Sequence, residues 1–184
     1  MSSLGFQTGR IVARPIRSGD RANCLRTRME SELSFRQAKG DFLTLSQIDR
    51  ARFERMIARR ERWAAHDEHY VLGLFLKDSG CFIGDTLLFN IDRTIHARGE
   101  IGLVIYSRFQ TMGYGPECIT GTIAWGLGEP LGLEEVYGHI EDGNHASTIA
   151  CLRAGFRLLT SAPVPRRFEG ETQLCWPISV RSLP

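Results

Sequence analysis

The stretch Gln110-Thr111-Met112-Gly113-Tyr114-Gly115-Pro116-Glu117 is the part of this chain that decides its fold. It follows residues 101–106, an apolar run that predicts a strand, and it precedes residues 118–125, whose pattern is typical of a helix. Glycines at such a turn let several free backbone N–H groups converge, and the helix dipole adds partial positive charge there. The turn therefore suits a pyrophosphate, although ordinary turns between a strand and a helix share this spacing.

Length and composition indicate one globular domain over residues 1–184. The chain has 184 residues, of which 42% are hydrophobic and 24% charged, so it can bury a sizeable core. A net charge of +2 gives little support for a nucleic-acid partner. The sequence shows neither a signal peptide nor an apolar run near the ~20 residues that cross a bilayer. We therefore expect a cytoplasmic protein without a membrane partner.

The cysteines point to no disulfide framework and no metal site. They are scattered, odd in number and lack any Cys-x-x-Cys pair. Such a pattern is typical of reduced thiols in a cytosolic protein. The five are Cys24, Cys81, Cys118, Cys151 and Cys175.

The remaining pattern predicts strands and helices in a fixed order around the glycine turn. We expect strands over residues 10–16, 70–76, 81–89, 100–106, 134–140, 156–159 and 172–176, and helices over 20–35, 45–65, 116–126 and 145–154. Residues 92–99 and the proline-rich stretch 161–170 are expected as loops. The second helix is crowded with arginines, which indicate either a solvated face or a patch for an anionic substrate.

Four pieces of this sequence, in this order, resemble the GNAT N-acetyltransferase superfamily over essentially the whole chain. Gln110, Gly113 and Gly115 match its Gln/Arg-x-x-Gly-x-Gly/Ala pattern, and residues 142–147 with 152–156 resemble its next block. Residues 8–15 and 99–103 resemble the Rim-type branch, which acetylates N-terminal amines of ribosomal proteins. The resemblance implies an α+β, three-layer fold: a mixed, mostly antiparallel sheet of about seven strands, flanked by four helices and splayed at the acetyl-CoA site.

The same resemblance implies acetyl-CoA as the donor, with no metal. The turn would hold its pyrophosphate through backbone N–H groups, and the preceding strand would pair with the pantetheine arm. A backbone N–H near Ile105 would polarise the thioester carbonyl. Asn144 would bind the arm or a water, with Ser147 beside it. The implied cofactor-binding residues are Leu103, Val104, Ile105, Gln110, Thr111, Met112, Gly113, Tyr114, Gly115, Asn144 and Ser147.

Glu100 is the first candidate for the catalytic base, because it opens the strand that leads to the acetyl site; a surface carboxylate at a strand end is the alternative. Glu141 and Asp142 fit a turn and N-cap pair better than catalysis. His139 would face the cleft, although a lone strand histidine is more often structural. His66, His69 and His96 have weaker claims.

Two residues depart from the superfamily pattern. Cys151 stands where many members carry a tyrosine that protonates the leaving thiolate, so the acid stays unassigned, and this difference favours the Rim-type branch. Thr111 stands where glycine or arginine is common.

The acceptor predicted from this resemblance is a primary amine, most plausibly a protein or peptide N-terminus. The alternatives are a small amine, such as an antibiotic or polyamine, and a non-catalytic module that binds acetyl-CoA. A homodimer is a further expectation, because dimers are frequent in this superfamily.

Overall fold

The computed structural model describes residues 4–31, 49–168 and 170–182. In this part of the chain the strands form one nine-stranded sheet of order β1-β2-β3-β4-β5-β6-β9-β7, with β8 also paired to β9. The strands are β1 Phe6–Gln7, β2 Ile11–Arg14, β3 Tyr70–Leu76, β4 Phe82–Asp92, β5 Arg98–Ile105, β6 Glu135–Glu141, β7 Arg157–Leu158, β8 Val164–Phe168 and β9 Glu171–Arg181. Neighbouring strands are antiparallel except β5 and β6, which are parallel.

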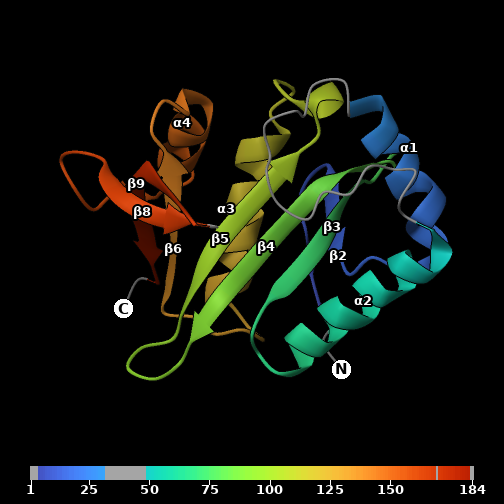
Figure 1. The fold of residues 1–184 in the computed structure, drawn as a ribbon, viewed down its shortest axis with the longest axis horizontal. Helices are drawn as coiled ribbons and strands as arrows, with labels where there is room; N and C mark the ends of the chain where they lie inside the picture. Colours follow the sequence, from blue (N-terminus) through green and yellow to red (C-terminus); the bar gives the residue numbers. More distant parts are fainter. Residues whose placement is uncertain (1–3, 32–48, 169, 183–184) are drawn as a thin grey trace.

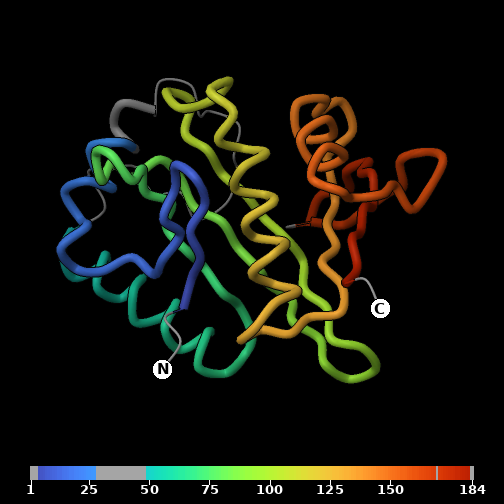
Figure 2. Tube along the Cα trace, turned by 180° about the vertical axis from the view of Figure 1, so that it is seen from behind, coloured from blue at the N-terminus to red at the C-terminus, as the bar shows by residue number. Residues whose placement is uncertain are grey.

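Helices cover both faces of the sheet, which gives three layers (Figures 1 and 2). The helices are α1 Arg21–Ser31, α2 Arg50–Ala65, α3 Tyr114–Leu127 and α4 His145–Arg153. Consecutive residues of β4 mark the two faces, because side chains alternate along a strand. Thr86 bonds Thr122 of α3 across a distance of 2.8 Å, whereas Asp85 accepts from Arg60 of α2. None of the described helices is long and apolar enough to cross a membrane.

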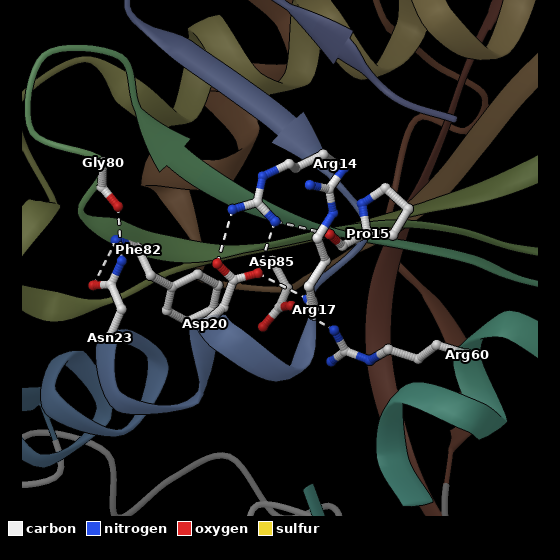
Figure 3. A network of polar contacts seen from close by, with 9 residues as sticks. All are labelled: Arg14, Pro15, Arg17, Asp20, Asn23, Arg60, Gly80, Phe82 and Asp85. Atoms are coloured by element: carbon white, nitrogen blue, oxygen red, sulfur yellow. Dashed lines mark hydrogen bonds and ion pairs between the residues drawn. The ribbon is translucent and has the colours of Figure 1, made fainter. Parts of the chain in front are cut away.

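Ion pairs fasten α2 and the 3-10 helix Ser18–Asp20, which leads into α1, to one face of the sheet, as Figure 3 shows. The Arg14 guanidinium of β2 donates to both carboxylate oxygens of Asp20, at 2.7 and 2.8 Å, and Asp20 also accepts from the backbone N–H of Arg17. Deeper in the fold, Arg60 of α2 donates to Asp85 of β4 at 3.0 Å. Asp85 is buried, so this pair places α2 firmly over β4.

The structure has two strands more than the sequence predicts, β1 and β8. Residues 161–170 were expected to be a loop, but Val164–Phe168 pair with β9. Pro165 hides this strand from sequence patterns, because proline cannot donate to a ladder and is tolerated mainly in edge strands. The β8 strand is such an edge, since β9 is its partner in the described sheet. The strand predicted over residues 70–76 has the same bounds as β3.

Residues 45–48 of the helix predicted from residue 45 lie outside the described part of the chain, and α2 itself begins at Arg50. The side chain of Asp49 accepts from the backbone N–H of Arg52, so Asp49 caps α2 and the helix starts at Arg50. The helix predicted over residues 20–35 starts at Arg21, and its final residues lie outside the described part of the chain.

Candidate active site

The two parallel strands at the centre of the sheet separate after three paired residues. The pairs join Arg98 to Glu135, Gly99 to Val136 and Glu100 to Tyr137, and there the pairing of β5 with β6 stops. The β5 strand continues to Ile105 while remaining paired with β4, and β6 continues while remaining paired with β9. The strands diverge toward the top of Figure 1. The expected splay is therefore present, and one backbone edge of residues 101–105 has no strand partner. The place where the two strands diverge is called the opening below.

The glycine turn lies at the far end of that β5 edge. A short 3-10 helix, Ser107–Phe109, leads into it, and the Gln110 side chain donates to the Ile105 carbonyl at 2.9 Å. Thr111 has φ 63° and Gly113 has φ 80°, so two residues are left-handed just before α3 begins. For a threonine this conformation is costly, and such strain tends to occur at functional sites.

The turn presents unused hydrogen-bond donors to solvent. Residues 110–113 are exposed, and the backbone N–H groups of residues 111–115 have no acceptor among the described residues. Adjacent free N–H groups at a helix N-terminus form a concave site for an anion. Leu103, Val104 and Ile105 lie along the open edge that leads to it.

Contacts between Arg10, Met112 and Glu117 hold the turn in place. The Arg10 guanidinium donates to the Met112 carbonyl at 3.1 Å and pairs with Glu117 in the first turn of α3 at 2.7 Å. Burial alone would raise the pKa of Glu117, but hydrogen bonds from Thr8 and Arg10 outweigh burial and leave this pKa below its usual value. Arg10 also lies over the Tyr114 ring, 4.5 Å from its centroid. The sequence analysis missed these contacts, because nothing in the pattern relates residues about a hundred positions apart.

Glu100 is enclosed by donors at the point where the opening begins. Its carboxylate lies 2.9 Å from the His139 Nδ1, accepts from the Asn90 amide at 3.0 Å and pairs with Arg166 at 2.8 Å. Only 2% of Glu100 is exposed. It therefore is not a surface carboxylate at a strand end. Its register with Phe89 places it on the side of the sheet that α1 and α2 cover.

Tyr137 completes this cluster. Its ring lies edge-on to the His139 ring, with centroids 6.1 Å apart, and the Arg98 guanidinium is 5.6 Å from its centroid. Burial, and next the charge of Glu100, raise the pKa of Tyr137, so its hydroxyl stays protonated near neutral pH. The sequence analysis named Glu100 and His139 as candidates but did not predict that Asn90 and Arg166 would contact Glu100.

The polar residues that follow β6 form hydrogen bonds with α4 and β9. The Asn144 side chain caps α4 by accepting from the Ser147 N–H at 3.1 Å. Asp142 accepts from the Trp176 indole at 2.9 Å, and Glu141 is exposed. Asn144 thus caps α4 with its side-chain oxygen, and its amide nitrogen remains a donor.

Among the other histidines, His69 touches the Glu100 cluster, because its Nδ1 accepts from the backbone N–H of Asn90 at 3.3 Å. His66, His96 and Cys151 make contacts elsewhere. His96 lies 3.2 Å from a Glu135 oxygen, His66 contacts the Arg62 carbonyl, and the His69 ring packs against Trp63. Cys151 is buried, and burial raises its pKa to about 11. Its thiolate is therefore scarce at neutral pH, which makes Cys151 a core thiol.

No group of three or more His, Cys, Asp or Glu side chains in the described ranges is arranged to hold a metal ion.

Comparisons with known proteins agree with this geometry. Residues 10–157 match the family model described as an acetyltransferase (GNAT) domain. A ribosomal-protein-S5-alanine acetyltransferase from Vibrio fischeri superposes with a TM-score of 0.78 at 17% identity, covering 97% of each chain. RimJ from Mycobacterium smegmatis, in complex with CoA-disulfide, gives 0.78 at 14% identity, over 94% of this chain and 82% of that one.

A third structure, a spermidine N-acetyltransferase SpeG chimera from Vibrio cholerae and hSSAT, gives a TM-score of 0.66 at 15% identity, over 93% of this chain and 95% of that chain. At such identities these structures show a shared fold. The family match covers most of the sequence and includes the opening and the turn. The chain therefore belongs to the GNAT acetyltransferase family and is an N-acetyltransferase.

Proposed function

We propose that this enzyme transfers the acetyl group of acetyl-CoA to the N-terminal amine of a protein or peptide. The proposed donor site rests on one observation. A continuous path leads from the Glu100 cluster, along the open β5 edge, to the turn of free N–H groups. The path from Glu100 to Ile105 spans roughly 17 Å of strand. A pyrophosphate on residues 111–115 would leave an extended arm lying along residues 103–105, with its thioester toward the Glu100 cluster.

The chemistry of the acceptor favours an α-amine. An amine attacks only through its neutral form, and an N-terminal amine titrates near ~7.7–8.0 whereas a lysine amine titrates near ~10.4. At pH 7 the neutral fraction is therefore roughly 300-fold larger for the N-terminus. A site with a modest base is sufficient for such an acceptor.

The charges around Glu100 also favour a peptide over a polyamine. A polyamine needs unpaired carboxylates, yet the carboxylate at the site is already paired with Arg166. Arg98 and Arg166 supply positive charge on the same side of the sheet. These charges suit an acceptor that carries a carboxylate or a carbonyl beside its amine.

Acetyl transfer to defined amines tests this proposal. The purified chain is given acetyl-CoA with peptides that differ in their first two residues, with the same peptides blocked at the N-terminus, and with spermidine and an aminoglycoside. We expect mass spectrometry to place one acetyl group on the α-amine of unblocked peptides, with acidic second residues preferred. Turnover of the cationic small molecules alone would refute the peptide assignment, and CoA binding without any transfer would indicate a non-catalytic module.

A further inference from the structure

We infer that His139 is the general base of acetyl transfer and that Glu100 is the residue that positions it. The inference rests on acetyl transfer by this chain and is independent of the class of amine that accepts the group. It assigns to His139 the role that the sequence suggests for Glu100, and the reason is the burial of Glu100.

The register of β5 and β6 brings the two side chains together. Glu100 is paired with Tyr137 in the last pair before the strands separate. His139 lies two residues beyond Tyr137 and so projects from the same face of the sheet. It belongs to the part of β6 that is no longer paired with β5, and therefore it stands on the wall of the opening where a thioester would lie.

The hydrogen bond between them determines which ring nitrogen is free. The His139 Nδ1 lies 2.9 Å from the Glu100 carboxylate, which accepts hydrogen bonds when ionised. The proton of the neutral ring is therefore on Nδ1, and Nε2 carries a lone pair. No acceptor or donor among the described residues contacts Nε2. A carboxylate that fixes the tautomer of a histidine in this way is the arrangement of many acyl-transfer sites.

Access separates the two candidate bases. The side chain of Glu100 is 3% exposed and is held by Asn90, Arg166 and His139, so no amine reaches its oxygens without displacing a partner. The side chain of His139 is 22% exposed. A general base must come within hydrogen-bond reach of the proton it removes. His139 meets this requirement and Glu100 does not.

The titratable groups around His139 come from four strands. The Glu100 carboxylate of β5 and the Tyr137 ring of β6 contact the His139 ring. Arg166 of β8 reaches the cluster through Glu100, with its guanidinium within 2.9 Å of both Glu100 oxygens, and Arg98 lies over the Tyr137 ring. Glu141 lies two residues beyond His139 on the same face of β6, and Cys175 of β9 is its partner in the ladder.

The proposed step balances without another reactant. The neutral amine attacks the thioester carbonyl, forming the C–N bond. His139 Nε2 takes the proton that this nitrogen must lose and becomes imidazolium. The C–S bond then breaks, the thiolate of CoA leaves and takes up a proton, and the imidazolium returns to its neutral form by releasing its own. One amide and one thiol result, and the histidine is unchanged.

Steady-state kinetics of matched variants test the inference, with whichever amine the wild-type chain acetylates. We expect His139→Gln to lower kcat at neutral pH by about 10²-fold or more, to leave the KM for acetyl-CoA within twofold, and to abolish the acidic limb of kcat/KM. The control is His96→Gln, because His96 forms a similar pair with Glu135 away from the opening. The control should keep the wild-type rate and profile.

Two positioning variants give shifts of opposite sign. Glu100→Gln removes the charge that favours imidazolium, so the acidic limb should move to lower pH along with a loss of kcat. Arg166→Gln leaves the Glu100 charge unopposed, so the limb should move to higher pH. A merely structural role would lower activity without moving the limb in either direction.

If the variants fail to fold, the inference can still be tested on the His139 ring of the wild-type protein. Long-range ¹⁵N correlation spectra of wild-type protein should show neutral His139 protonated on Nδ1. A ring protonated on Nε2, or a His139→Gln variant with the wild-type kcat and acidic limb, would overturn the inference. Acetylation of spermidine alone would refute the peptide acceptor instead, and the same variants would then be read with spermidine.

Discussion

Replacing Gly113 by alanine should weaken CoA binding, because the turn needs a left-handed residue immediately before α3. Gly113 has φ 80°, where an L-residue with a Cβ is strained. The new Cβ itself is nearly accommodated: its closest neighbour would be the Arg10 Nη2 at 3.4 Å, the end of a flexible side chain. The backbone conformation, and not a clash, is therefore the main cost of this change.

The size of the effect follows from that strain. An L-residue in the left-handed region costs about 1–2 kcal/mol. If the free turn relaxes to avoid this cost, CoA must restore the conformation on binding, and its dissociation constant rises by about 5- to 30-fold. Isothermal titration with CoA measures the dissociation constant, and urea denaturation of the same samples measures the free energy of unfolding.

Gly80→Ala provides the matched control. Gly80 also has a positive φ, 65°, in the hairpin between β3 and β4, and its Cβ would meet nothing within 4 Å. It should carry a similar stability cost and bind CoA as the wild type does. If the Gly113 variant is destabilised less than this control, its free turn has relaxed; wild-type CoA affinity in that variant would mean that the pyrophosphate does not sit on this turn.

Two further predictions concern stability. Glu117→Gln should lower the free energy of unfolding at pH 7 by about 1–2 kcal/mol, because it removes the charge that pairs with Arg10. The folded pKa of Glu117 is lowered, so its charge stabilises the fold fully above the unfolded pKa of 4.5, and this stabilisation is lost as pH falls through the folded pKa. A lower unfolding free energy of the variant in urea that persists at pH 2 would contradict this. Gly84→Ala should cost about 3 kcal/mol or more, because the Cβ would lie 1.9 Å from the Val104 carbonyl oxygen. Gly19→Ala, with nothing within 4 Å, is the control, and equal melting temperatures for the two variants would refute the close approach.

Local patterns in the sequence predicted the parts of the fold that depend on neighbours in the chain. The run over residues 70–76 is continuous and apolar, and it is a buried strand with those bounds. The glycines at 113 and 115 and the strand before them predicted a turn that leads into a helix, which the structure confirms. The prediction was wrong where the sequence signal was mixed. In β8, Pro165 and two arginines are typical of a loop.

The sequence predicted several residues of the candidate site but not the contacts between them. Sequence reasoning named Glu100 and His139 separately, because each lies on a strand expected near the acetyl site. It could not pair them, since their distance depends on the parallel register of β5 and β6. It could not place Arg166 beside Glu100, because that side chain reaches Glu100 only after β8 folds back on β9.

The sequence by itself determined the family, the strand, turn and helix of the proposed donor site, and the absence of a tyrosine at position 151. These depend on residue type and short spacing, which the chain carries before it folds. Only the tertiary structure decided which of the two candidate side chains is accessible. Burial encloses Glu100 and leaves the His139 ring at the edge of the opening, and burial is a property of the packed sheet that no single segment possesses.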